Sequence, residues 1–588
     1  MQQLMTVRGE NLKDTPWDRY PRPQMRRDSW MNLNGAWEFA FDHGNSGENR
    51  GMHLENAAYP LTIQVPFCPE SKLSGIEYKD FIAAVWYRRT VTLTEEQCNR
   101  RIFLRFGAAD YRTTVYVGGK KVDTHVGGFS SFGMEITKFV TPGENVIVVQ
   151  CQDDTRSGRQ PVGKQSRRIY ASEGALYTRT TGIWQTVWLE FTPRTYIDSV
   201  RITPDDRNRR VSFAAKVDGC AKDTVIKAQI SRDGRIVGGA CARPVPGVTN
   251  FMADVSEAEL WQPGAPVLYD VTFTLERNGE VIDTVSSYFG FRAIEIIGDK
   301  FLINGKAVFQ RTVLDQGYYP DGILTAPSDE ALKADIELSM AVGFNGARLH
   351  QKVFEERFLY WADKLGYLVW GEHASWGLDI TSAEGLANFL PEWMEILKRD
   401  VTHPAIIGWC PFNETNHLQD KRVLRTVWQA TKDYDPSRPC IDVSGYCHVV
   451  TDVYDDHDYD QNPETLRARY LDHYDISPNP FNRTYCPYQG QPFFLSEFGG
   501  TLWSPGMEGG CGYGDPPKTE DEAVARIISL FDAVLDNPKI CGYCFTQLTD
   551  VEQEQNGIYY YSRRKKYTDE NYARLRAAQI RKAAYEEE

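Results

Sequence analysis

The sequence has no continuous apolar run of the ~18 residues that a membrane-spanning helix requires. It also has no excess of positive charge, because 66 Lys and Arg residues face 80 Asp and Glu residues and the net charge is −14. A protein that binds nucleic acid needs a basic surface to neutralise phosphates. We therefore expect neither a membrane protein nor a nucleic-acid-binding protein.

Paired cysteine motifs and zinc-helix motifs are missing as well. The 12 cysteines are scattered, and the single C-x-x-C, Cys541 to Cys544, has no partner pair, which predicts packed thiols. Glu372 and His373 are adjacent, but no second histidine completes an H-E-x-x-H motif. The amino-terminal residues contain no apolar segment of the secretory type. We expect a cytoplasmic protein without a metal or other cofactor.

No period of about 20–50 residues recurs, which disfavours a solenoid or a propeller. The first third of the chain instead consists of strand-like segments with Gly-rich turns, and Gly118-Gly119 is typical of a hairpin turn. Helical periodicity is scarce there, so we predict a β-sandwich over residues 1–194. The segments that support it are Ala84–Leu93, Arg101–Phe106, Thr113–Val117 and Val146–Cys151.

A second β-rich unit is predicted over residues 195–294, with a size that suits a small immunoglobulin-like sandwich. Its expected strands are Val211–Val217, Val225–Ser231, Val267–Arg277 and Val281–Phe289.

The pattern changes over residues 295–588, where short apolar strands alternate with longer amphipathic helices. Alternation of this kind predicts a (β/α)₈ barrel, in which chemistry is located at the carboxyl ends of the strands. The expected helices are Asp329–Ala341, Glu355–Leu365, Phe389–Asp400 and Glu570–Tyr585. The expected strands are Ala307–Leu314, Asn345–Leu349, Tyr367–Trp370, Ile406–Phe412, Pro439–Val443, Val450–Tyr454, Phe493–Leu495 and Gly542–Gln547.

Two glutamates lie at the ends of such strands. Glu414 follows the fourth strand directly after Asn413, and Glu497 ends the seventh strand ahead of a Gly pair. A single glutamate in such a place is more simply explained by a salt bridge at the barrel rim. Two of them can converge on one sugar, and retaining glycoside hydrolysis needs a pair of carboxyl groups about 5 Å apart. The pair therefore favours a glycosidase.

Five segments in order resemble glycoside hydrolase family 2, the family of β-galactosidases, β-glucuronidases and β-mannosidases. They are LNGAWEF (Leu33–Phe39), TTGIWQTVWLE (Thr180–Glu190), FGFRAIEIIGDKFLINGKAV (Phe289–Val308), THPAIIGWCPFNE and FFLSEFGG. The resemblance covers nearly the whole chain. It implies a sugar-binding sandwich of the jelly-roll type, an immunoglobulin-like domain and a catalytic barrel, and it makes self-association plausible.

The resemblance also assigns roles. Glu414 would be the acid/base, Glu497 the nucleophile, and Asn413 a ligand of the sugar 2-hydroxyl. Arg348 would hold the nucleophile ionised, with a structural ion pair as the alternative. Here His350 follows Arg348 by two positions where the family often has three, and Asp315 lies where a His is common. Both are retained as substrate-binding candidates.

Further substrate-binding candidates come from loops at the strand ends, and each has a simpler structural interpretation. For the residues after the sixth strand the alternative is a polar loop, and for the tryptophans it is packing in the core or on a mobile surface loop. The Gly499–Lys518 loop, which follows the nucleophile, is expected to shape the aglycone side. The candidates are Tyr454, His457, Tyr459, Trp376, Trp503 and Gln547.

The sequence predicts the type of reaction more precisely than it predicts which sugar is hydrolysed. Hexuronidases of the family carry an Asn-x-Lys pair that grips the substrate carboxylate, whereas Glu554–Tyr559 contains Asn556 and no Lys two residues later. The Arg563–Lys566 run lies close by and could substitute, although a solvated charge run explains it better. We therefore predict an exo-acting β-galactosidase. A β-glucuronidase, β-mannosidase or arabinosidase is the alternative, as is a non-catalytic carbohydrate-binding protein.

Overall fold

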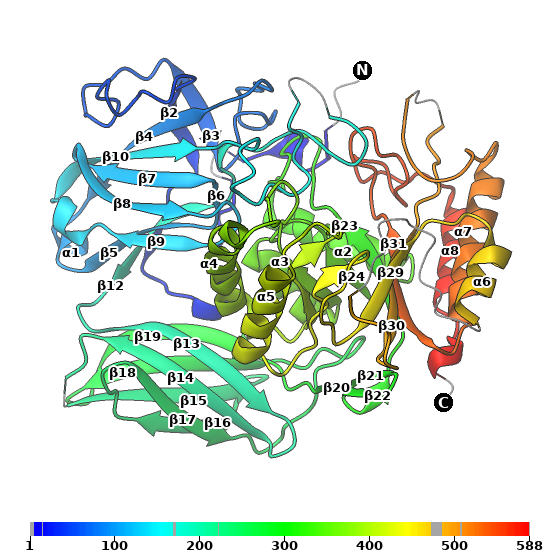
Figure 1. Cartoon of the computed structure of the whole chain (residues 1–588). Coiled ribbons are helices and arrows are strands. Elements are labelled where there is room, and N and C mark those ends of the chain that lie inside the picture. Colours follow the sequence, from blue (N-terminus) through cyan, green and yellow to red (C-terminus); the bar gives the residue numbers. More distant parts are fainter. Residues whose placement is uncertain are drawn as a thin grey trace.

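The computed structural model describes residues 5–13, 16–168, 172–221, 223–471, 485–505 and 509–586. Two β-sandwiches and a larger α/β barrel follow one another along the chain (Figure 1). The first sandwich, blue to cyan, lies above the second, and both border the barrel, which contains the helices α2 to α8. The predicted architecture of two sandwiches and one barrel is confirmed.

The first sandwich packs a six-stranded sheet, in the order β3-β2-β4-β10-β7-β8, against a four-stranded sheet, β1-β12-β5-β9. Alternation in β2 explains the packing, because Trp37 and Phe39 turn inward while Glu38 stays exposed. The elements are β1 (Trp30–Asn32), β2 (Gly35–Phe41), β3 (Leu61–Val65), β4 (Ala84–Leu93), α1 (Glu95–Cys98), β5 (Arg101–Phe106), β6 (Ala109–Asp110), β7 (Arg112–Val117), β8 (Lys120–Val126), β9 (Phe132–Glu135), β10 (Gly143–Gln152), β11 (Gly182–Ile183) and β12 (Val187–Thr192).

The second sandwich packs β13-β14-β17 against β16-β15-β18-β19. Its core contains an edge-to-face pair, Phe213 and Phe273, whose ring centroids are 5.1 Å apart. The strands are β13 (Tyr196–Asp205), β14 (Arg210–Asp218), β15 (Thr224–Arg232), β16 (Arg235–Ala242), β17 (Val248–Asp254), β18 (Tyr269–Arg277) and β19 (Glu280–Phe289), and a small sheet of β20 (Ile294–Ile297), β21 (Lys300–Ile303) and β22 (Lys306–Ala307) leads into the barrel.

The barrel contains a parallel sheet of seven strands, in the order β26-β25-β24-β23-β31-β30-β29, and a separate parallel pair, β27 with β28. Within the described residues, no helix is both long and apolar enough to cross a membrane. The strands are β23 (Gln310–Asp315), β24 (Gly346–Leu349), β25 (Leu368–Glu372), β26 (Ile406–Cys410), β27 (Phe412–Asn413), β28 (Val443–Ser444), β29 (Tyr454–Asp458), β30 (Phe493–Gly499) and β31 (Ile540–Thr546). The helices are α2 (Asp329–Ala341), α3 (Glu356–Leu365), α4 (Ala383–Asp400), α5 (Lys421–Tyr434), α6 (Pro463–Leu471), α7 (Glu520–Leu535) and α8 (Asp569–Gln579).

Three predicted barrel strands have clearly different bounds in the structure. The fifth strand, predicted over Pro439–Val443, is the short β28 at Val443–Ser444. The fourth strand is split into β26 and β27 at Pro411, which has no backbone N–H to donate to a neighbouring strand. The sixth strand was predicted over Val450–Tyr454 but starts at Tyr454 and continues through buried polar residues to Asp458. That strand is stabilised by polar partners, since His448 forms a 3.0 Å ion pair with Asp455. A search for apolar runs cannot find such a strand.

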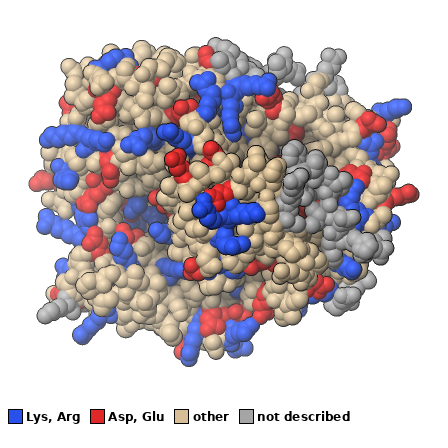
Figure 2. All heavy atoms as spheres, viewed as in Figure 1, with Lys and Arg blue, Asp and Glu red and all other residues tan. Residues whose placement is uncertain are grey.

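The 12 cysteines are free, and Cys541 and Cys544 are buried in β31, as predicted. On the face shown in Figure 2, Lys and Arg side chains are interspersed with Asp and Glu side chains. This face presents both signs of charge side by side, as the balance of the composition leads one to expect.

Candidate active site

The carboxyl ends of the barrel strands bring a group of buried polar residues together. Arg348 comes from β24, Glu372 ends β25, Asn413 ends β27, and Glu497 lies within β30. Each of these four side chains is at least nine-tenths buried. Buried charges of this kind are retained only where they are paired, and these pairs lie at the carboxyl ends of the barrel strands, where such barrels place their chemistry.

Glu497 is held in its ionised form. Arg348 Nη1 donates to Glu497 Oε1 at 2.9 Å, the Tyr459 hydroxyl donates to Oε2, and His457 Nδ1 lies 3.5 Å from Oε2. Burial alone raises the pKa of Glu497, but the positive charges of His457 and Arg348 outweigh it and lower the pKa to about 2. The group is therefore an anion throughout the neutral range, as a nucleophile must be.

Arg348 connects Glu497 to its neighbours. Its Nε donates to Glu372 Oε2 at 2.6 Å, and its Nη2 donates to Asn413 Oδ1 at 2.6 Å. Burial opposes the charge of the guanidinium, but the carboxylates of Glu372 and Glu497 hold its pKa well above the ordinary value. Arg348 thus fixes the orientation of both Glu497 and Asn413.

Glu414 lies close to Glu497. Its backbone has φ +47°, a left-handed conformation, and His457 Nδ1 lies 2.8 Å from its Oε1. One carboxylate oxygen from each glutamate and a ring nitrogen of His457 lie within 4.8 Å of one another. Two carboxylates this near each other agree with the close pair, about 5–5.5 Å apart, that retaining glycosidases use.

His457 lies between the two carboxylates. Burial lowers the pKa of its imidazole, yet the charge of Glu497 and the hydrogen bond to Glu414 raise it above the ordinary value. Its other nitrogen, Nε2, lies 2.9 Å from Ser444 Oγ. Within the described residues, Glu414, His457 and Glu497 also form the one cluster of metal-type donors. His457 Nδ1 bonds the Glu414 carboxylate, and we interpret the three residues as a hydrogen-bonded acid/base group.

Asn413 offers a free donor to a substrate. Its Oδ1 is occupied by Arg348, while its Nδ2 is buried and has no hydrogen-bond partner among the residues that the structure describes. An unsatisfied buried donor costs about 1–3 kcal/mol, which a substrate hydroxyl beside the nucleophile would offset. This is the position in which the sequence predicted a contact with the sugar 2-hydroxyl.

Aromatic side chains form the walls of the pocket. The Tyr459 ring stacks on Tyr513 with centroids 3.5 Å apart and an interplanar angle of 6°. Trp376 Nε1 donates to the Asn413 carbonyl oxygen at 3.2 Å. Tyr513 belongs to the Gly499–Lys518 loop, which is described apart from residues 506–508.

The other predicted substrate ligands have different surroundings. His350 Nδ1 lies 3.1 Å from Arg348 Nη2, and burial keeps the pKa of this imidazole well below its ordinary value, so it is neutral. Asp315 accepts a hydrogen bond from the Gly317 N–H, and burial raises its pKa to about 6. Gln547 Nε2 donates to Asn556 Oδ1 at 2.8 Å.

Two candidates lie outside the group of buried polar residues around Arg348. Tyr454 begins β29 rather than ending it and packs among His448, Tyr488 and Phe493. Its side chain is therefore at the opposite end of the strand from the pocket. Trp503 packs against the barrel core.

Three participants were not singled out from the sequence. Glu372 ends the third strand and could have been found by the same rule that found Glu497. Tyr513 lies in a loop whose conformation no local pattern predicts. Lys164 reaches the pocket from the first sandwich, and its Nζ lies 4.2 Å from the centre of the Trp376 ring.

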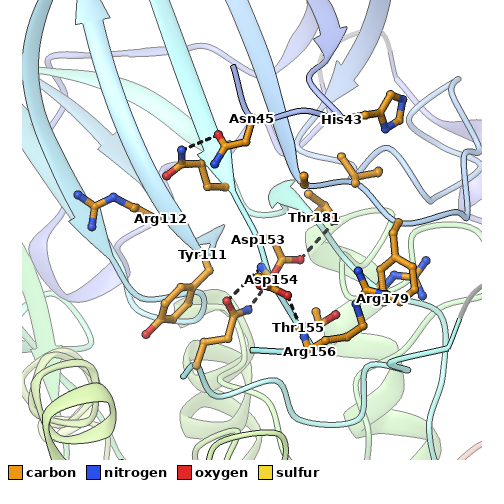
Figure 3. Close-up of a pocket in the computed structure, with 15 residues that line it drawn as sticks. His43, Asn45, Tyr111, Arg112, Asp153, Asp154, Thr155, Arg156, Arg179 and Thr181 are labelled. Atoms are coloured by element: carbon orange, nitrogen blue, oxygen red, sulfur yellow. Dashed lines mark hydrogen bonds between the residues drawn. The ribbon is translucent and has the colours of Figure 1, made fainter. Parts of the chain in front are cut away.

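A second cavity, of about 420 Å³, lies in the first sandwich (Figure 3). Asp153 accepts a 2.7 Å hydrogen bond from Gln160, and burial raises the pKa of Asp153 to about 7. Arg156 and Arg179 lie over the ring of Phe81, at 3.8 and 4.1 Å from its centre. The lining residues all precede the barrel in sequence, so this cavity is separate from the pocket that contains the two glutamates.

Comparison with known proteins assigns three segments to one family. Residues 50–160 match the description "Glycosyl hydrolases family 2, sugar binding domain", residues 195–292 match "Glycosyl hydrolases family 2", and residues 294–508 match "Glycosyl hydrolases family 2, TIM barrel domain". The three matches follow the order predicted from the sequence.

Curated relatives are mostly β-glucuronidases. The β-glucuronidase of Rattus norvegicus is 26% identical over 454 residues, covering 70% of this chain and 68% of that protein. The β-glucuronidase of Paenibacillus borealis is 24% identical over 449 residues, covering 71% and 74%. A β-galactosidase of Thermoanaerobacter pseudethanolicus is 25% identical over 427 residues, covering 69% of this chain and 53% of that protein.

Solved structures share the fold. The β-glucuronidase of Ruminococcus gnavus in complex with D-glucuronic acid superimposes with a TM-score of 0.78 at 20% identity, covering 96% of this chain and 100% of that chain. A second structure of that β-glucuronidase gives a TM-score of 0.79 at 20% identity, covering 96% and 99%.

Proposed function

The chain belongs to glycoside hydrolase family 2 and is a retaining glycoside hydrolase, and from this premise we propose that it is an exo-acting β-glucuronidase. The sequence favoured β-galactosidase and kept β-glucuronidase as an alternative. The names of the relatives now support that alternative better, because the β-glucuronidases among them match at least as well as the β-galactosidase.

The proposed mechanism is a double displacement. Glu414 protonates the glycosidic oxygen while Glu497 attacks the anomeric carbon, which breaks the bond to the aglycone and forms a glycosyl–enzyme ester. Glu414, now deprotonated, takes a proton from water, and the resulting attack on the anomeric carbon releases the sugar with its original configuration. The observation that supports this mechanism is the approach of the two carboxylates to within 4.8 Å around an ionised Glu497.

A β-galactosidase is the second candidate, and one feature of the pocket favours it. Hexuronidases of the family have Asn-x-Lys, whereas in this chain Ile558 stands two residues after Asn556, and Asn556 Nδ2 donates to Glu554 Oε1 at 3.2 Å. The basic residues nearby are already paired, Arg563 with Asp335 at 3.0 Å and Lys566 with Asp550 at 2.6 Å. A carboxylate beside Asn556, with no lysine at position 558, would disfavour a uronic acid.

A panel of aryl β-glycosides tests the proposal. The glucuronide, galactoside, glucoside and mannoside share one leaving group, so differences in kcat/KM report on the sugar alone. We expect the glucuronide to exceed each neutral sugar by about 100-fold or more, because a site built to pair a charged group discriminates strongly against analogues that lack it. A preference for the galactoside would contradict the proposal and support the second candidate.

The pH dependence provides a separate test of His457. Its positive charge lowers the pKa of Glu497, so His457→Gln should raise that pKa and let the nucleophile be protonated at a higher pH. We expect the acidic limb of the kcat/KM profile to move up by roughly one pH unit. Ser444→Ala is the matched control, because it removes a partner of His457 Nε2 and leaves the charge in place. An unchanged acidic limb in the His457 variant would show that another group sets it.

A further inference from the structure

A loop of the first sandwich packs against the barrel and places Lys164 beside the candidate active site. The backbone N–H groups of Val162 and Gly163 donate to the Trp376 carbonyl oxygen at 2.8 and 3.0 Å. Gly163 has φ +68°, and a Cβ atom there would lie 2.5 Å from the Gln351 carbonyl oxygen, so only glycine permits this approach. The next residue, Lys164, is thereby held against the rim of the catalytic pocket.

The Lys164 ammonium has no partner of opposite charge. Its Nζ lies 4.2 Å from the centre of the Trp376 ring, and within the described residues it forms no hydrogen bond or ion pair, although the residue is only 6% exposed. The charge acts on the pocket, since it lowers the pKa values of both His350 and Glu497. A nearly buried cation without a partner is costly unless a ligand supplies the anion.

The other basic side chains around the barrel mouth are already committed. Arg348 is saturated by Glu372, Glu497 and Asn413. Lys352 donates to two backbone carbonyl oxygens at 2.8 and 2.7 Å. In the Arg563–Lys566 run, Arg563 and Lys566 are in ion pairs with Asp335 and Asp550, and Arg564 and Lys565 are exposed. Among these buried cations, all within the described residues, Lys164 alone is free to meet a substrate.

We propose that Lys164 binds the carboxylate of the uronic acid in the catalytic pocket and so takes the place of the lysine that the barrel lacks. The inference rests on the proposed β-glucuronidase function and deepens it. Burial strengthens the attraction between the ammonium and the carboxylate, because little water competes there. The Trp376 ring stabilises the ammonium until the substrate arrives.

Substitution of Lys164 tests the assignment with a matched pair of substrates. Aryl glucuronide and aryl glucoside differ only in the carboxylate that replaces a hydroxymethyl group. We expect Lys164→Gln to lower kcat/KM for the glucuronide by about 100-fold and for the glucoside by less than about threefold. Lys164→Arg should restore most of the glucuronide activity. Arg167→Gln, an exposed position in the same loop, is the control and should leave both values unchanged.

Each other outcome overturns the assignment. If Lys164→Gln lowers kcat/KM equally for both substrates and moves the acidic limb of the pH profile, then the lysine acts on Glu497 and not on the substrate. If neither value changes, the lysine has no role in binding. Lys164→Met, which keeps the apolar stem, replaces the Gln variant if its Tm shows poor folding. A wild-type enzyme that ignores the glucuronide would reject the β-glucuronidase proposal itself, and a wild-type preference for the glucuronide separates the two failures.

Discussion

Glu497→Gln is expected to lower kcat by at least about 10⁴-fold, because an amide cannot form the glycosyl–enzyme ester. The substitution keeps the shape of the side chain and removes its negative charge. Arg348 would retain Glu372 as an ionic partner, so the fold should persist and Tm should change by only a few degrees. The measurement is kcat for an aryl glycoside together with a thermal melt of both proteins.

Chemical rescue by azide tests whether the loss of activity is caused by the loss of the nucleophile. In Glu497→Ala, azide has room to attack the anomeric carbon from the face that the nucleophile occupied, so the product should be the glycosyl azide of inverted, α configuration. Glu330→Gln, at a half-exposed glutamate of α2, is the control and should behave as the wild type. A Glu497→Gln enzyme with more than about a tenth of normal activity would place the nucleophile elsewhere.

Glu414→Ala is expected to have the second largest effect, and the size should depend on the leaving group. A glycoside with a poor leaving group needs protonation of its oxygen, so its hydrolysis should slow by about 10³–10⁴-fold. A dinitrophenyl glycoside needs no such help in the first step, and its aglycone should appear in a burst. The second step then lacks its general base, and the glycosyl–enzyme should accumulate.

Rapid mixing and mass spectrometry of the intact protein measure both predictions. The burst should equal the enzyme concentration, and the adduct should map to the peptide that contains Glu497. Azide should restore turnover and yield the β-glycosyl azide, because it attacks the ester from the face that Glu414 leaves open. If all leaving groups were slowed equally, Glu414 would not be the acid/base.

Much of the fold of this protein can be predicted from local sequence patterns. Alternation in strands such as β2 predicts the sandwiches, because one face must be apolar and the other polar. The two glutamates could be found because each stands at the carboxyl end of an apolar barrel segment, Glu414 directly after β27 and Glu497 near the end of β30. These are properties of single segments, and no knowledge of distant residues is needed to read them.

The remaining features depend on contacts between segments. The sixth barrel strand is polar, and the ion pair between Asp455 and His448 stabilises it. Gln547 points toward Asn556, a partner nine residues farther on, and not to the catalytic pair. Lys164 precedes the barrel by more than a hundred residues, and only the docking of Gly163 on Trp376 brings it to the pocket.

Because the loop that contains Gly163 packs on the barrel, the first sandwich and the barrel both contribute residues to the candidate active site. If Lys164 has the proposed role, the barrel carries out bond cleavage, whereas the first sandwich contributes to the choice of sugar through the loop around Gly163. Exchanging the loop around Gly163 between homologous enzymes offers a way to change sugar selectivity without altering the two carboxylates. Conversely, an isolated barrel would keep the reactive pair and lose part of its discrimination.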